Sequence, residues 1–385
     1  MVAEILTPSL ILFGEGSLAR STEVLKKVGV SRPLIVTDRG LVKAPIFEAF
    51  KAVLTSSGVE FGVFSETVPD PDMDAVEAGV NAFRAGNYDG LIGFGGGSAM
   101  DTAKAMNVWL HSDGDIRKWR VPAAPSMPVL PLICVPTTAG TGSEVTRATV
   151  ITDPVTHEKI LFMGLACVPV AAIVDPDLTR ELPFRIAADT GIDALTHAIE
   201  AYVSRRRNPH SDAMALDAMR LIGPNLIKAC VERSDEARAS VMLGATHAGI
   251  AFSNASVALV HGMSRPLGSF FKMPHGMSNA VLLPSVTVFS APAALDRYAI
   301  CARTIGFADA SDNDEAAKDK LLQGLESLNR ELKVPTLSEF GISREDYFEK
   351  IPTMAEQAVA SGSPNNNPRI ANVAEISELY ADLWS

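Results

Sequence analysis

The chain has 385 residues, of which 47% are hydrophobic and 21% are charged, and its formal net charge is −11. A single hydrophobic core stops growing at roughly 250–300 residues, so we expect two domains. The acidic balance, with no Lys/Arg run longer than the three arginines at 205–207, argues against a nucleic acid partner. The 4 cysteines show no C-x-x-C spacing, which indicates reduced thiols in a cytoplasmic protein.

Short β-branched runs alternate with segments of helical periodicity in the first half of the chain. The predicted strands cover residues 34–37, 59–64, 90–94, 129–135 and 171–174, and the predicted helices between them cover 16–28, 42–57, 74–85 and 99–109. Such alternation predicts a mostly parallel sheet that helices cover on both faces. We therefore expect a Rossmann-like α/β domain over residues 1–182.

From residue 183 onward the chain is rich in Ala, Leu and Met at helical spacing and has almost no strand signal. This pattern predicts an all-α second domain over residues 183–385. The stretch 239–264 carries no Asp, Glu, Lys or Arg and is long enough to cross a bilayer. Its histidines and other polar residues would be costly in lipid, so a buried helix pair is the better interpretation, without a membrane partner. Residues 361–368 read as an ordered turn before a final helix over 371–384.

The first chemical signal is a glycine-rich turn between a predicted strand and a predicted helix, with the sequence GFGGGSAMDTAK at 93–104. Exposed N–H groups and the helix dipole attract a phosphate in this geometry, and the glycines let an anion approach the backbone closely. The turn fits neither the G-x-G-x-x-G nor the Walker pattern. A tight turn without a ligand therefore remains an alternative.

A second polar loop, PTTAGTGSE at 136–144, also follows a predicted strand. Its hydroxyls could bind a ribose, a pyrophosphate or an amide, and ligands of open parallel sheets lie beyond the carboxyl ends of the strands. Asp38 ends another predicted strand. Its carboxylate could accept from the adenosine ribose hydroxyls and repel a 2′-phosphate, which favours NAD over NADP. The alternative is that Asp38 only forms a turn.

Four residues form a candidate metal site. Asp193 and His197 lie four positions apart in GIDALTHAIEAYV, so on a helix they share one face. His261 and His275 are too far apart for one helical face, and prolines interrupt the segment between them, so they must come from separate helix starts or loops. One carboxylate and three imidazoles suit a divalent transition metal. The alternative is that each histidine is a buried polar group of an apolar helix.

Five motifs in order make the chain resemble the iron-containing, or group III, alcohol dehydrogenases. They are GGGSAMDTAK, PTTAGTGSEVT, GIDALTHAIEAY, VHGM-x-x-PLG and PHGMSNAVLLP, and the resemblance covers nearly the whole chain. It implies a metal-dependent enzyme that transfers hydride between a small primary or secondary alcohol, or the aldehyde, and NAD(H). The metal would lower the pKa of the alcohol or polarise the carbonyl.

The resemblance also implies roles for individual residues. Asp193, His197, His261 and His275 would bind the metal, usually Fe²⁺ and in some members Zn²⁺. The residues that would bind NAD are Asp38, Gly95, Gly96, Gly97, Ser98, Asp101, Thr137, Thr138, Ser143 and Lys159, the last near the nicotinamide ribose. Phe252 would line the substrate channel.

Arg265 departs from the family pattern. The family commonly has a proton-relay histidine four residues after the third ligand, and an arginine cannot shuttle protons. We hypothesise that Arg265 faces the substrate and pairs with a carboxylate, sulfonate or phosphonate group, with an interhelical salt bridge as the alternative. His247 could replace the lost relay, and the alternative is an ordinary core histidine.

Other functions are weighed against this one. The alternatives are a metal- and NAD-dependent lyase of the dehydroquinate-synthase type, a zinc polyol dehydrogenase of the glycerol type and a catalytically silent nucleotide-binding protein. The third and fourth ligand motifs favour an alcohol dehydrogenase.

The apolar segment 5–13 could form a strand that pairs across a two-fold axis, so we expect a homodimer. No secretory signal opens the chain, which agrees with a cytoplasmic location.

Overall fold

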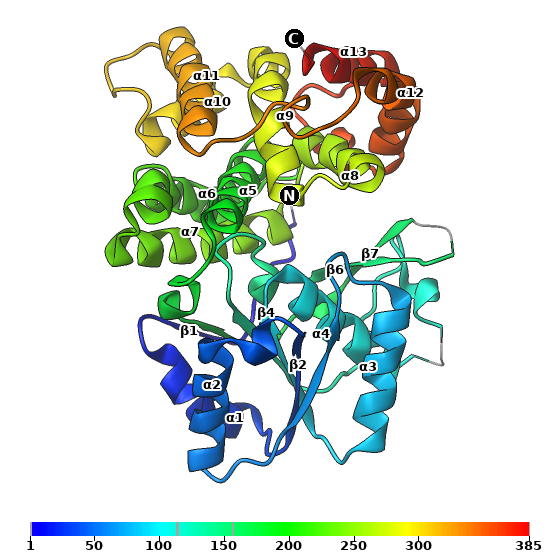
Figure 1. The fold of residues 1–385 in the computed structure, drawn as a ribbon. Coiled ribbons are helices and arrows are strands. Elements are labelled where there is room, and N and C mark those ends of the chain that lie inside the picture. The colour runs from blue at the N-terminus through cyan, green and yellow to red at the C-terminus, as the bar shows by residue number, and fades with distance from the viewer. Residues whose placement is uncertain (1, 113–114, 156–157, 385) are drawn as a thin grey trace. The chain divides into compact units, whose positions relative to one another are not determined.

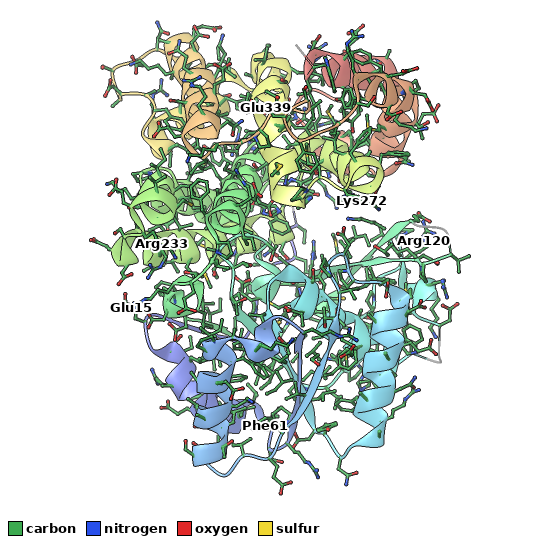
Figure 2. All side chains as sticks on the ribbon, viewed as in Figure 1. Glu15, Phe61, Arg120, Arg233, Lys272 and Glu339 are labelled. Atoms are coloured by element: carbon green, nitrogen blue, oxygen red, sulfur yellow. The ribbon has the colours of Figure 1, made fainter. Side chains whose placement is uncertain are left out.

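The computed structural model describes residues 2–112, 115–155 and 158–384 (Figure 1). They divide into two compact units, one spanning Ile5–Glu181 and the other containing the described residues from Leu182 onward with a few at the N-terminus. The first unit is α/β, and the described part of the second is helical. This is the predicted fold class. Charged side chains such as Arg120 and Glu339 lie at the surface of their units (Figure 2).

A parallel sheet of six strands, in the order β1-β8-β5-β4-β2-β3, forms the centre of the first unit. Its strands are β1 Leu10–Phe13, β2 Pro33–Asp38, β3 Gly62–Thr67, β4 Gly90–Gly95, β5 Leu132–Pro136 and β8 Ala171–Val174. All five predicted strands are present: the strand at 171–174 has the predicted bounds, and the other four have shifted ends. The chain reverses its direction of travel across the sheet between β2 and β4, and ligands of open α/β sheets bind at such a switch point.

Helices cover both faces of this sheet. They are α1 Ser21–Val28, α2 Pro45–Ser56, α3 Met73–Ala85 and α4 Gly97–Leu110. One buried cluster contains residues of α3 and α4, among them Val76 and Met106. A second cluster contains Leu25 of α1 and Phe50 of α2. Because the central strands are buried on both sides, they read as continuous apolar runs, which is why the sequence predicted them.

The sequence did not predict an antiparallel hairpin, β6 Ala148–Thr152 and β7 Lys159–Met163. Both strands alternate buried and partly buried residues, so neither shows a continuous apolar run. The segment 5–13 was expected to be a strand, but only Leu10–Phe13 is one. All 4 cysteines are buried and free, as the reduced-thiol prediction requires.

Helix α5 is buried along most of its length and contacts several helices of its unit. The helices after residue 182 are α5 Phe184–Val203, α6 Pro209–Ile222, α7 Asp235–Asn254, α8 Leu259–Phe271, α9 His275–Ser290, α10 Leu295–Ile305, α11 Asp314–Glu331, α12 Arg344–Ala360 and α13 Val373–Asp382. The turn predicted over 361–368 contains the short 3-10 helix Ser363–Asn366. The final helix is present as α13.

The charge-free stretch 239–264 is divided between α7 and α8, which bend by 104° at the break. Most of its residues are buried. Among the described residues no single helix is long and apolar enough to cross a membrane, although this bent pair meets the length and composition test. The predicted buried helix pair is therefore what the structure contains.

Candidate active site

Helix α5 supplies the first two candidate ligands. Asp193 and His197 project from adjacent turns, with 3.9 Å between Asp193 Oδ2 and His197 Nδ1. Both side chains are buried. The helix begins after Pro183 and its second half is made mainly of small and apolar residues, so a continuous buried helix can hold both groups on one face.

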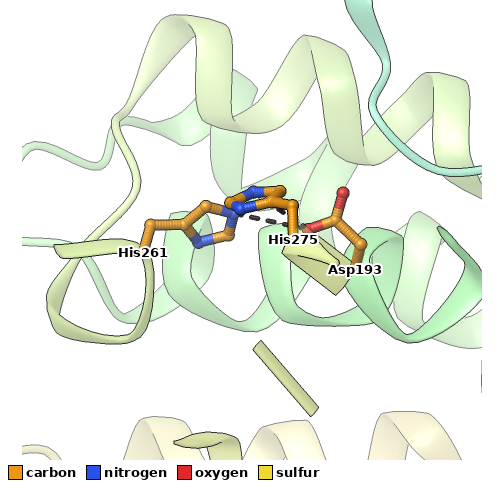
Figure 3. A group of neighbouring side chains, drawn as sticks. All are labelled: Asp193, His261 and His275. Carbon is orange, nitrogen blue, oxygen red and sulfur yellow. Dashed lines mark ion pairs between the residues drawn. The ribbon is translucent and has the colours of Figure 1, made fainter. Parts of the chain in front are cut away.

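Helices α8 and α9 bring the other two candidates to Asp193. His261 lies in the first turn of α8, and His275 is the first residue of α9. Asp193 Oδ1 lies 3.5 Å from His261 Nε2 and 3.7 Å from His275 Nε2 (Figure 3). The three ligand atoms lie within 4.8 Å of one another, so one ion could contact all three. His261 and His275, which are too far apart in sequence for one helical face, thus come together because each lies at the start of its own helix.

His197 lies beside this triad. Its ring stacks on Phe252 with centroids 4.1 Å apart and on His261 with centroids 4.4 Å apart. The structure therefore brings Asp193, His261 and His275 together as one set of donors, and it places the fourth predicted ligand next to them. Phe252, predicted at the substrate channel, contacts the candidate metal site through His197.

Electrostatics favour a cation at this triad. Burial alone would raise the pKa of Asp193, but His197, His275 and His261 outweigh it and hold that pKa far below its usual range. Burial alone would lower the pKa of His261, but Glu200 and Asp193 raise it to about 9. A buried carboxylate and imidazoles within reach of one point are donors that divalent transition metals prefer, so these residues fit the metal.

Glu200 is a site residue that the sequence reasoning missed. Its Oε2 accepts from His261 Nδ1 at 2.6 Å and from the N–H of Ala258 at 2.9 Å, and its Oε1 accepts from the N–H of Val260 at 2.6 Å. Glu200 therefore fixes the ring that carries His261 Nε2 and caps the start of α8. One signal could have revealed it, because Glu200 lies seven residues after Asp193 on the same helical face.

The glycine-rich turn joins β4 to α4 in the α/β unit. Gly95 has φ +149°, and a Cβ there would lie 2.8 Å from the Cβ of Ala99, so this position requires glycine. A Cβ on Gly97 would lie 3.0 Å from Thr141. Helix α4 starts without a side-chain cap among the described residues. The N–H groups of its first turn are therefore oriented for an anion.

The second polar loop lies against this turn. The N–H of Thr137 donates to the carbonyl of Gly95 at 3.0 Å. The hydroxyl oxygen of Thr138 is buried and has no hydrogen-bond partner among the described residues. A Cβ on Gly96 would lie 3.7 Å from that hydroxyl. An unsatisfied buried hydroxyl beside an open glycine fits a polar cofactor.

Asp101 and Ser143, both predicted to bind the cofactor, bond to each other. Asp101 Oδ1 accepts from Ser143 Oγ at 2.7 Å, and Oδ2 accepts from the N–H of Val150 at 3.0 Å. Burial raises the pKa of Asp101. Lys104 Nζ donates to Thr146 and to the carbonyl of Ala148. These contacts tie α4 to the second loop and to β6.

Asp38 lies at the end of β2, next to the switch point of the sheet. Its Oδ1 accepts from the N–H groups of Gly40 at 2.8 Å and Leu41 at 2.9 Å. This oxygen of Asp38 therefore stabilises a turn, as the alternative interpretation of Asp38 expected. A hollow of about 570 Å³ is lined by Asp38, Arg39, Gly40, Glu66, Thr67, Val68, Pro69, Gly96, Ser98 and Ala99. The predicted cofactor-selecting acid and three residues of the glycine-rich segment 93–104, namely Gly96, Ser98 and Ala99, thus share one cavity.

Three further predicted residues have other surroundings. Lys159 begins β7, and its Nζ donates to Asp70 Oδ1 at 2.7 Å. His247 of α7 has its Nδ1 2.7 Å from Asp217 Oδ2 of α6. Arg265 is partly buried and forms no hydrogen bond or ion pair with any described residue, and burial lowers its pKa despite the attraction of Glu200. The interhelical salt bridge considered for Arg265 is therefore not found in the described part of the chain.

Comparison with known proteins agrees with this geometry. The model of the iron-containing alcohol dehydrogenase family matches residues 8–176, and that of the C-terminal part of the Fe-containing alcohol dehydrogenase family matches residues 187–384. Lactaldehyde reductase of Escherichia coli (strain K12) is 34% identical over 375 residues, which cover 97% of each chain.

Solved structures show the same relationship. A 1,3-propanediol oxidoreductase superposes with a TM-score of 0.94 and 32% identity, and the match covers 100% of each chain. Sulfoacetaldehyde reductase from Bifidobacterium kashiwanohense, solved in complex with NAD⁺, superposes with a TM-score of 0.89 and 29% identity over 100% of this chain and 99% of that one.

The chain belongs to the iron-containing alcohol dehydrogenase family. It is an oxidoreductase of alcohols and aldehydes, and Fe²⁺ and NAD fit it as cofactors. The lyase and polyol dehydrogenase alternatives are not favoured, because these relatives are alcohol dehydrogenases and aldehyde reductases.

Proposed function

We propose that this enzyme interconverts a small alcohol and its aldehyde with NAD(H), and that Asp193, His197, His261 and His275 hold its ferrous ion. The observation that carries the proposal is the triad of donor atoms within 4.8 Å of one another, of which Asp193 and His261 are buried and His275 is exposed. When bound, the ion supplies Lewis-acid polarisation of the substrate oxygen. Zn²⁺ would suit the same donors.

The protein groups around the triad have separate tasks. Glu200 holds His261 in one orientation, and a ligand that is fixed in this way loses less freedom when it binds a metal. The side chain of His275 is 45% exposed, whereas that of Asp193 is 3% exposed, so His275 marks the open side of the triad. Phe252 covers His197 with an apolar ring and keeps water from that face.

In the α/β unit we propose that the first turn of α4 receives the NAD pyrophosphate and that Thr138 donates to it or to a ribose. The buried, unpartnered hydroxyl of Thr138 supports this assignment. Asp38 would accept from the adenosine ribose, which would favour NAD over NADP. Asp101 and Ser143 would act by holding the loops in place, since they bond to each other. Lys159 would have to leave Asp70 to reach the nicotinamide ribose, as the family resemblance implies.

We also propose that Arg265 selects substrates that carry an anionic group. A partly buried guanidinium without a counter-ion is unfavourable, and a substrate carboxylate, sulfonate or phosphonate would remove that cost. Arg265 lies one helical turn after His261, so the two side chains share a face of α8. Sulfoacetaldehyde reductase, one of the structural relatives, is named for a substrate of this charged kind.

His247 receives no proton step in this proposal. Its contact with Asp217 joins α6 to α7, which supports the core-histidine interpretation rather than the relay.

Strand β1 lies at one edge of the sheet and pairs only with β8 among the described strands, and the exposed fraction of Phe13 is 38%. We therefore propose that β1 pairs with its copy in a homodimer. We also propose a cytoplasmic location for the protein. The four buried free cysteines of the chain are compatible with it.

One experiment tests the proposed activity. The enzyme is freed of metal with a chelator, reloaded with Fe²⁺ or Zn²⁺, and given neutral and acidic aldehydes with NADH or NADPH. We expect loss of NADH absorbance that requires metal and that is faster with NADH than with NADPH. If no aldehyde or alcohol changes the NADH absorbance of metal-loaded enzyme, the proposed function is wrong.

A further inference from the structure

Asn279 of α9 lies at the centre of the donor triad. Its Nδ2 is 2.6 Å from Asp193 Oδ1, 3.2 Å from His261 Nε2 and 3.4 Å from His275 Nε2. The residue is fully buried, and it follows His275 by four positions on the same helix. One amide nitrogen therefore contacts all three atoms that would bind the ion.

The orientation of this amide follows from its neighbours. The amide nitrogen carries two hydrogens and faces a carboxylate and two ring nitrogens, whereas a flipped amide would place an oxygen against the Asp193 carboxylate. The opposite atom, Asn279 Oδ1, is buried and has no partner among the described residues. The Oδ1 atom of Asn279 thus stays unsatisfied while the Nδ2 atom donates to Asp193. This indicates that the bond from Nδ2 to Asp193 determines the orientation of the side chain.

The three contacts are unequal. The bond to Asp193 is short, as expected for a donor to a charged carboxylate, and the two contacts to the histidines are long. An ion held by the same histidines would replace these two long contacts. A carboxylate oxygen has more than one acceptor site, so the bond from Asn279 to Asp193 can persist beside an ion.

We propose that Asn279 is a positioning residue of the metal site: its amide nitrogen fixes the Asp193 carboxylate for the ion. The proposal rests on the ligand set of the proposed function. Without this donor, Asp193 would be free to rotate towards the neighbouring histidines, and the ion would have to reorder it on binding. Residues that hold a ligand in this way typically contribute about 10–100-fold to metal affinity.

The test is a titration of the full-length metal-free enzyme with Co²⁺, with affinity measured against a competing chelator and the visible absorption band recorded. The variants are Asn279→Ala, and Asn279→Leu, which keeps a similar volume but donates no hydrogen bond. Asn367→Ala is the matched control, because Asn367 is also a buried asparagine of this unit but donates to Ser290 and to the Arg369 carbonyl. Circular dichroism and Tm of the metal-free proteins report on folding.

We expect both Asn279 variants to raise the Kd for Co²⁺ by about 10–100-fold and to alter the absorption band. Asn367→Ala should change Tm alone. A Kd within twofold of wild type for Asn279→Leu would overturn the proposal, since packing and not the hydrogen bond would then matter, and tighter binding would overturn it as well. His261→Ala tests the ligand set separately: if it binds Co²⁺ as wild type does, the proposed metal site fails, whatever Asn279 does.

Discussion

Glu200→Gln should remove most of the upward shift in the pKa of His261. The substitution keeps the shape of the side chain and removes the charge, and the variant can no longer accept at both of its ends. In wild type the pKa of His261 is raised from 6.5 to about 9 although burial opposes protonation. At about 1.4 kcal/mol for each pKa unit, this shift corresponds to about 3 kcal/mol of interaction with the protonated ring.

The sign of the pH dependence follows from this direction. A pKa that is raised in the folded state adds stability that is fully present below 6.5 and is lost as the pH rises through about 9. Wild-type metal-free enzyme should therefore lose about 3 kcal/mol of unfolding free energy from this group between these pH values. Glu200→Gln should lose much less, because burial then acts on His261 with only Asp193 to oppose it.

Two measurements check the prediction. Denaturant unfolding of metal-free wild type and variant at several pH values gives the difference between the two pH profiles, in which groups common to both proteins cancel. NMR of ring-labelled histidine, with the signal of His261 identified by its loss in His261→Ala, gives the pKa directly. An unchanged pKa of His261 in Glu200→Gln, or parallel stability profiles, would refute the reasoning. A control, Glu339→Gln, changes an exposed carboxylate of the same unit and should leave the His261 pKa unaltered.

Three further predictions concern the substrate and the cofactor. Arg265→Ala should lower kcat/KM for a carboxylated aldehyde by about tenfold or more and leave that for a neutral aldehyde nearly unchanged, since a hydrogen-bonded charge pair contributes about 1.5–3 kcal/mol; an unchanged ratio in steady-state kinetics would contradict the anion role. Thr138→Val should raise the Kd for NADH up to about tenfold in fluorescence titrations without lowering Tm, because it removes a buried hydroxyl that has no protein partner. Asp38→Gly should shift the ratio of kcat/KM for NADH and NADPH towards NADPH, and a constant ratio would show that Asp38 only forms a turn.

The sequence by itself determined the class of the fold and the candidates for its chemistry. Alternation of apolar runs and helical periods predicted the parallel sheet, because its central strands are buried on both faces. The spacing of Asp193 and His197 placed both on one face of a helix, since helical geometry is local. The ordered motifs then indicated the family. The hairpin β6–β7 was missed because its residues are only alternately buried.

Only the tertiary structure decided which residues complete the site. His261 and His275 meet Asp193 through the starts of α8 and α9, and no local pattern encodes where a helix start lies in space. Glu200 and Asn279 are ordinary helical residues in the sequence, and their partners come from other helices. Arg265 was recognised in the sequence as a departure, but its lack of a partner among the described residues is a property of packing. Hydrogen bonds between distant segments depend on the whole fold, whereas periodicity and motifs depend on neighbours along the chain.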